Sequence, residues 1–110
     1  MVFNNEESLI IISQEKISID IFFENLEKAY PKLKNENLVI DLLGFTKLTP
    51  YNVLVFLEIS KKHRKNGKSF VLVSEKVSYN DVPEEISLVP TLQEARDIVE
   101  MEEIERDLGI

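Results

Sequence analysis

Asp41 is the acidic residue whose position most suggests chemistry. It lies near the end of the apolar run Leu38-Val39-Ile40-Asp41-Leu42, which is too short for a helix and is typical of a buried strand. Proteins with α/β folds commonly place functional groups at the ends of such strands. A carboxylate there can also accept hydrogen bonds from backbone N–H groups of the following loop. Both interpretations stay open, and we favour the structural one.

The residue types that support most enzyme chemistry are scarce in this chain. Cysteine is absent, which excludes thiol catalysis, disulfides and cysteine-based zinc or iron–sulfur sites. Histidine occurs once, as His63, so one chain cannot form a poly-histidine metal site. The glycines at positions 44, 67 and 109 cannot form a Gly-rich phosphate loop, and no G-x-S-x-G motif occurs. We therefore expect no enzyme activity, no catalytic residues, no metal site and no cofactor.

His63 belongs to the one basic cluster of the sequence, which comprises Lys61, Lys62, His63, Arg64, Lys65 and Lys68. Cations are favoured at the C-terminus of a helix, where they interact with the negative end of the helix dipole. A phosphate-binding role is the alternative, but no aromatic residue is interleaved among these residues. We predict that the Lys and Arg residues of the cluster form a solvated helix end, and that His63 is a cation that interacts with the negative end of the helix dipole.

The charge of the chain limits its partners. It has 110 residues, of which 13 are basic and 20 acidic, giving a net charge of −7. Binding to nucleic acid or anionic membranes depends on Lys and Arg, so both are disfavoured. Residues 91–110 hold seven acidic residues against two arginines, a net of −5. No apolar run approaches a membrane span and the segment MVFNNEES does not resemble a signal peptide, so we expect a cytoplasmic protein.

The hydrophobic pattern predicts strands that alternate with helices. Short apolar runs indicate strands within residues 8–13, 38–42, 69–74 and 86–89, the last an edge strand. Apolar residues at steps of three and four indicate helices over residues 19–30, 51–65 and from 91 to the end. No repeat or linker interrupts this order. It predicts one domain, 1–110, with a mainly parallel sheet of about four to five strands and about four helices.

Local signals mark the helix ends. Ser18, Thr49 and Thr91 are predicted N-caps, and Pro50 follows Thr49 at the first helical position. Pro31 should end the first helix near Tyr30, because proline lacks the N–H and clashes with the preceding turn.

Two segments carry a resemblance to a known family. They are LVIDLLGFTKLTPYNVLVFLEISKKHRKNGKSFVLV, residues 38–73, and VPTLQEARDIVEMEEIERDLG near the C-terminus. With the element order, they resemble the sulfate-transporter and anti-sigma-factor-antagonist (STAS) domain, and the C-terminal segment is similar to the tail of small single-domain bacterial members. The resemblance implies a STAS-like α/β fold and a regulatory function based on protein binding.

The resemblance also implies that the usual phosphorylation switch is degenerate. In the family the strand ends I-D-L-S and the next helix opens with D-S-S-G-L, whose first serine is phosphorylated. In the ungapped match Asp41 occupies the position of the strand-end aspartate. The positions of D-S-S-G are occupied by Thr49, Pro50, Tyr51 and Asn52. Proline has no hydroxyl group. Thr49 and Tyr51 are the two replacements nearby, although Thr49 is more simply a helix cap.

A partner-binding surface is expected around the loop and helix that follow this strand. STAS domains dock partners there, and the corresponding residues here include Phe45, Leu48, Thr49, Pro50 and Tyr51. Apolar and aromatic residues in a loop commonly anchor interfaces. The alternative is that Phe45, Leu48 and Tyr51 close the end of the sheet.

The C-terminal segment supplies a second candidate surface. Met101, Ile104 and Leu108 continue the apolar stripe of the last helix into residues 101–110, an acidic extension that adds about 15 Å of helix. The stripe either meets a second molecule, for example in a homodimer, or packs on its own domain.

The resulting hypothesis is a non-enzymatic, bacterial, cytoplasmic STAS-like module that binds a partner protein without the usual serine switch. One alternative is a phosphorylation-controlled anti-sigma factor antagonist that uses Thr49 or Tyr51, with an anti-sigma factor-like kinase as its partner. Another is an accessory protein of ribonuclease Z, because similar small proteins resemble ones encoded beside that enzyme.

Overall fold

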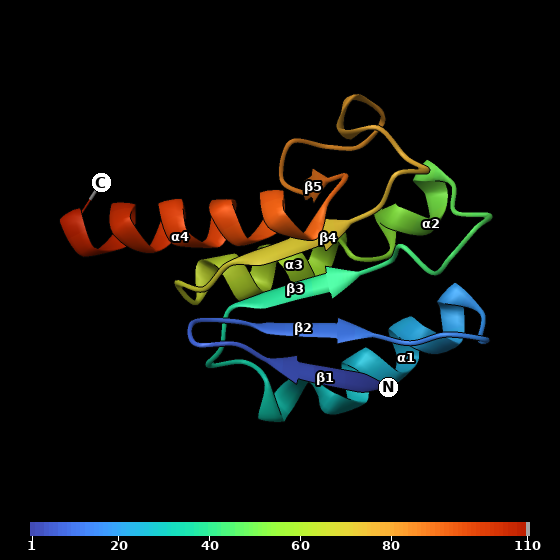
Figure 1. The fold of residues 1–110 in the computed structure, drawn as a ribbon, viewed down its shortest axis with the longest axis horizontal. Helices are drawn as coiled ribbons and strands as arrows, with labels where there is room; N and C mark the ends of the chain where they lie inside the picture. Colours follow the sequence, from blue (N-terminus) through green and yellow to red (C-terminus); the bar gives the residue numbers. More distant parts are fainter. Residues whose placement is uncertain (110) are drawn as a thin grey trace.

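A five-stranded sheet forms the centre of the computed structural model, which describes residues 1–109 (Figure 1). Its strands lie in the order β1-β2-β3-β4-β5. β1 pairs antiparallel with β2, and the other neighbours pair in parallel. The strands are β1 (Val2–Asn5), β2 (Ile10–Ser13), β3 (Leu38–Asp41), β4 (Phe70–Val73) and β5 (Ser87–Val89).

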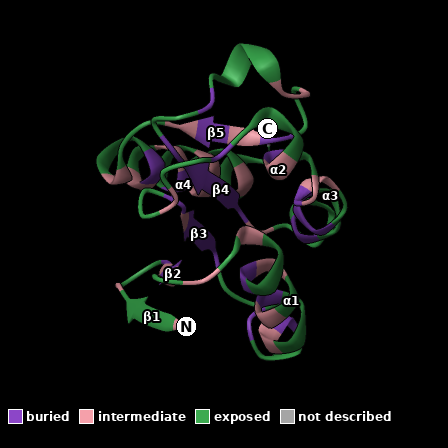
Figure 2. Ribbon diagram, turned by 90° about the vertical axis from the view of Figure 1, so that its right-hand side faces the viewer, coloured by how far each residue is buried: buried purple, intermediate pink, exposed green. Residues whose placement is uncertain are grey.

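Helices cover both faces of this sheet, as Figure 2 shows. α1 and α3 lie on one face and α4 lies on the other. The α-helices of the described residues are α1 (Ile19–Ala29), α2 (Pro50–Leu54), α3 (Leu57–Lys65) and α4 (Leu92–Leu108). Short 3-10 helices span Tyr30–Lys32 and Tyr79–Asp81. The predicted fold class, a mainly parallel sheet covered by helices, is confirmed.

The alternation of side chains along the strands divides the core in two. Ile40 and Leu72 face α1, α2 and α3, where they join a cluster that includes Phe22 and Phe56. Their neighbours along the strands face α4 and pack with Ala95 and Val99; these neighbours are Val39, Val71 and Val73. Because both faces are covered, the central strands are apolar throughout, as parallel strands usually are.

The predicted helix ends are confirmed. The hydroxyls of Ser18, Thr49 and Thr91 accept hydrogen bonds from the first turns of α1, α2 and α4. α1 ends at Ala29, and the chain continues through Pro31 as a 3-10 turn.

Two predictions about the elements require correction. The single helix expected over residues 51–65 is broken between α2 and α3. There the Phe56 N–H bonds the Val53 carbonyl, three residues back, at 3.0 Å. β-branched and aromatic side chains crowd the preceding turn of a helix, and Val53, Val55 and Phe56 concentrate such side chains at the break. β1 was also not expected from the sequence, because its four residues are all exposed and it forms by pairing with β2.

The prediction that His63 is a cation at a helix end is wrong. His63 lies in the last turn of α3, but its side chain is 0% exposed. Its Nε2 lies 2.7 Å from the Glu36 carbonyl oxygen, which can only accept, so Nε2 carries the hydrogen. In the neutral ring Nδ1 then accepts from the Tyr30 hydroxyl, also at 2.7 Å. Burial lowers the pKa of His63 and raises the pKa of Tyr30.

This buried imidazole predicts a pH-dependent stability. Unfolded His63 binds a proton near its ordinary pKa of 6.5, whereas the folded form binds it only at lower pH. The free energy of unfolding should therefore be level above about pH 7.5 and fall as the pH drops through about 6.5. Urea denaturation at several pH values measures it. His63→Gln should be less stable overall but lack this decline between about pH 7.5 and 5.5, and equal pH slopes in both proteins would contradict the assignment.

Candidate functional site

The loops after β2 and β3 meet at one end of the sheet, because parallel neighbouring strands end at the same edge. Between them lies a cavity of about 300 Å³. One side is lined by Gln14 and by residues 16–19, which enter α1, and the other by residues 44–48, which enter α2. This edge contains the surface that the resemblance predicts.

Asp41 has a structural role in its loop. Its Oδ1 accepts a hydrogen bond of 2.9 Å from the backbone N–H of Leu43. The favoured interpretation of this carboxylate is confirmed, and the bond fixes the direction in which the chain leaves β3.

Thr49 and Asn52 form a complete capping box at the start of α2. The Asn52 N–H donates to Thr49 Oγ1 at 3.3 Å, and the Thr49 N–H donates to Asn52 Oδ1 at 3.0 Å. The Thr49 hydroxyl also donates to Asn52 Oδ1, at 2.9 Å. This hydroxyl therefore both donates and accepts within the helix start, where Pro50 takes the first helical position.

The three apolar residues expected at a partner surface have different environments. Leu48 is 6% exposed and belongs to the core, so in this conformation it closes the sheet end and offers no contact. Phe45 is half-buried, and its ring centroid lies 5.6 Å from that of Phe22. Tyr51 is 78% exposed at the start of α2. Of the three, Tyr51 has the most surface to offer a partner.

Sequence reasoning missed two other exposed apolar side chains near this edge, Leu43 and Leu54. Leu54 lies three residues after Tyr51 on α2, so the two side chains share one side of that helix. No sequence signal distinguishes Leu54, because the segment VLVFLEI is apolar nearly all round. Only the packing of Val53 and Phe56 into the core shows which side faces outward.

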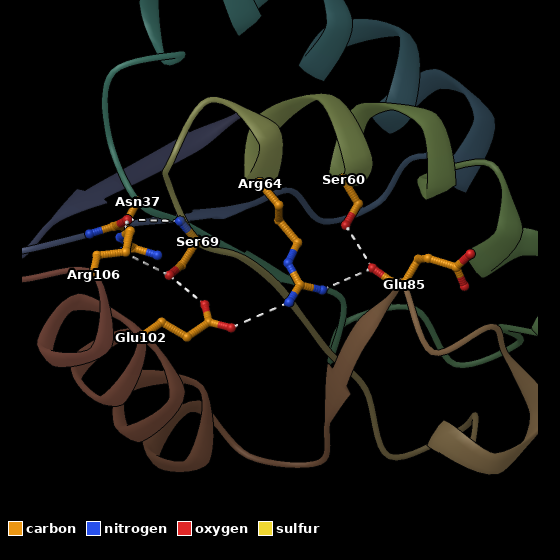
Figure 3. Close-up of polar contacts among 7 residues, drawn as sticks. All are labelled: Asn37, Ser60, Arg64, Ser69, Glu85, Glu102 and Arg106. Atoms are coloured by element: carbon orange, nitrogen blue, oxygen red, sulfur yellow. Dashed lines mark hydrogen bonds and ion pairs between the residues drawn. The ribbon is translucent and has the colours of Figure 1, made fainter. Parts of the chain in front are cut away.

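The second half of α4 contacts the rest of the chain through polar side chains (Figure 3). Ser69, which precedes β4, donates to Glu102 at 2.6 Å and accepts from Arg106 at 3.2 Å. Asn37, which precedes β3, accepts from Arg106 at 3.3 Å and donates to Glu103. Asn37 and Ser69 are 3% and 0% exposed. We call these five residues the polar seam.

The apolar stripe of the same helix faces away from the domain. Met101 and Ile104 are each 53% exposed, and Leu108 is 68% exposed. The second half of α4 packs on its own domain through the polar seam, and the apolar stripe, which one alternative placed against the domain, is left exposed. No pattern in the sequence distinguishes Asn37 and Ser69, which lie far from the helix along the chain.

Charged groups elsewhere have structural partners. Arg64 of the basic cluster donates to the Glu85 carbonyl at 3.0 Å and pairs with Glu102 at 3.5 Å. Arg96 holds Glu6 through two hydrogen bonds of 2.9 Å, and this lowers the pKa of that carboxyl.

Among the described residues no cluster of His, Asp and Glu could hold a metal ion. No helix in that part of the chain is both long and apolar enough to span a membrane.

Comparison with known proteins identifies the fold. No protein-family model matches the chain, and no curated protein matches it significantly. A solved structure described as "Molecular architecture of the stressosome, a signal integration and transduction hub" contains a similar chain. The TM-score is 0.59 at 20% identity, over 90% of this chain and 96% of that chain. The chain has a STAS-like fold.

The polar seam predicts a strong effect of Asn37→Ala. This change leaves the buried Ser69 N–H without its side-chain partner and removes the hydrogen bond to the carbonyl of Ser8, an exposed residue. An unpaired buried polar group costs about 1–3 kcal/mol, so the free energy of unfolding should fall by about that amount in urea denaturation. Hydrogen exchange in the last turns of α4 should also become faster. The matched control is Asn35→Ala at an exposed site two residues earlier, and an equal effect of both changes would contradict the role of the seam.

Proposed function

We propose that residues 1–110 form a non-enzymatic STAS-like module that regulates a partner protein by binding it. The binding surface is the outer side of residues 43–54, at the edge where β3 ends. The observation that carries the proposal is the exposure of Tyr51 and Leu54 together on one side of α2. The similar chain in the stressosome structure supports a role in signalling assemblies.

The capping box supports binding without the usual phosphorylation switch. Pro50 provides no hydroxyl at the position that the resemblance assigns to the acceptor serine. Phosphorylation of Thr49 would require its hydroxyl to give up its contacts with Asn52, which hold the start of α2. The Tyr51 side chain is exposed, so a kinase could reach its hydroxyl. Phosphorylation of Tyr51 therefore needs a direct test.

Partner binding is tested by comparing the full chain with Tyr51→Ala/Leu54→Ala in affinity capture from lysate of the source organism. Removing an aromatic anchor from an interface commonly costs about 2 kcal/mol, so recovery of a specific partner should fall about thirty-fold. Tyr79→Ala is the matched control, because Tyr79 is an exposed tyrosine in the segment before β5. Equal recovery with both variants, or no specific partner with the full chain, would overturn the proposed surface.

The same preparation separates the candidate partners. Purified ribonuclease Z and an anti-sigma factor-like kinase of the source organism should each be titrated against the full chain and the Tyr51→Ala/Leu54→Ala variant. A candidate is the regulated partner if it binds the full chain and loses that affinity with the variant.

The phosphorylation state gives an independent prediction. Incubation with source lysate and ATP, followed by intact-mass and peptide mass spectrometry, should show Thr49 and Tyr51 unmodified. The positive control is a STAS protein with the intact D-S-S-G motif, which is incubated in the same way and should be phosphorylated on its acceptor serine. Stoichiometric phosphate on either residue would contradict binding without a switch. It would favour the alternative, a phosphorylation-controlled anti-sigma factor antagonist.

A further inference from the structure

The last two turns of α4 are oriented opposite to a normal surface helix. Such a helix turns its apolar side to the core and its polar side to water. Here Glu102 and Arg106 point at the buried residues Asn37 and Ser69, as Figure 3 shows. The large apolar residues of this segment are the ones left exposed.

Those apolar residues form one stripe. Met101, Ile104 and Leu108 are spaced by three and four residues, which places them along one side of the helix. Figure 1 shows α4 running beyond the amino ends of β3 and β4, so the sheet offers nothing to cover this side. Turning the helix inward would break the hydrogen bonds of the polar seam. Within residues 1–109 nothing covers the stripe, which leaves it available to another molecule.

The charges around the stripe indicate which molecule. Exposed acidic residues of the same helix surround it, namely Glu94, Asp97, Glu100, Glu105 and Asp107. Both arginines of α4 are already engaged, Arg96 with Glu6 and Arg106 with Asn37 and Ser69. A second copy that packs its own α4 stripe on this one would thus bring acidic side chains against acidic ones, without a free arginine from α4 to compensate.

We propose that the outer face of α4, defined by Met101, Ile104 and Leu108, is a docking surface for a basic amphipathic helix of a different protein. The apolar side of that helix covers the stripe, and its flanking Lys and Arg residues pair with the acidic rim. This surface goes beyond the function proposed above, because the seam holds it at the amino ends of β3 and β4. The surface that contains Tyr51 lies at the carboxyl ends, so one chain can bind two partners at once.

A synthetic peptide tests this chemistry directly. The probe is an 18-residue helical peptide with leucines spaced by three and four residues and flanking lysines, titrated by calorimetry against the full chain. One peptide should bind per chain, and affinity should fall about ten-fold when salt rises from about 0.05 M to 0.5 M, because exposed charges are then screened. The same peptide with glutamates in place of the lysines should not bind.

Variants locate the binding on the helix. Met101→Gln/Ile104→Gln/Leu108→Gln keeps good helix formers at exposed sites and should abolish binding. Phe3→Gln/Tyr79→Gln, which removes exposed aromatic residues elsewhere, should leave it unchanged. Tyr51→Ala/Leu54→Ala should also bind the peptide normally, so failure of the loop surface and failure of this one are distinguishable.

Three results of the peptide titrations would overturn the proposal. They are no binding of the lysine peptide to the full chain, binding that survives the triple Gln change, and equal binding of the glutamate peptide. Sedimentation of the full chain should show a monomer. A dimer that dissociates in the triple variant would instead assign the stripe to a second copy of this chain.

Discussion

The side-chain amide of Asn37 is the contact on which the amino-terminal edge of the sheet depends. It donates to the Ser8 carbonyl ahead of β2 and accepts from the Ser69 N–H ahead of β4, while Asn37 itself leads into β3. The starts of three parallel strands are thus aligned by one buried side chain. The same amide receives Arg106, so the direction of α4 depends on it as well.

This arrangement separates the two ends of the sheet by the kind of surface they offer. The amino ends are occupied by polar groups that are satisfied inside the chain, and they hold a helix in place. At the carboxyl ends the loops are fixed by short local bonds, from Asp41 to Leu43 and from Thr49 to Asn52. None of these local bonds involves the Tyr51 side chain, which stays exposed.

Sequence patterns predicted the parts of this fold that local forces decide. The apolar runs of the central strands, the caps at Ser18 and Thr91, and the end of α1 shortly before Pro31 each have a cause within a few residues of the chain. β1 could not be predicted, because its exposed residues acquire a strand conformation only by pairing with β2. His63 could not be placed either, since its partners Tyr30 and Glu36 lie 33 and 27 residues away.

The orientation of α4 shows where periodicity stops being informative. Apolar spacing at 101, 104 and 108 defines a stripe, but Glu102 and Arg106 define an equally regular polar row on the other side. Which row faces the domain depends on what the domain presents, and at this position it presents buried Asn37 and Ser69. If the apolar row faced the domain, the buried polar groups of Asn37 and Ser69 would lose these partners, at a cost of about 1–3 kcal/mol each. The polar row therefore turns inward, and the apolar row is left exposed.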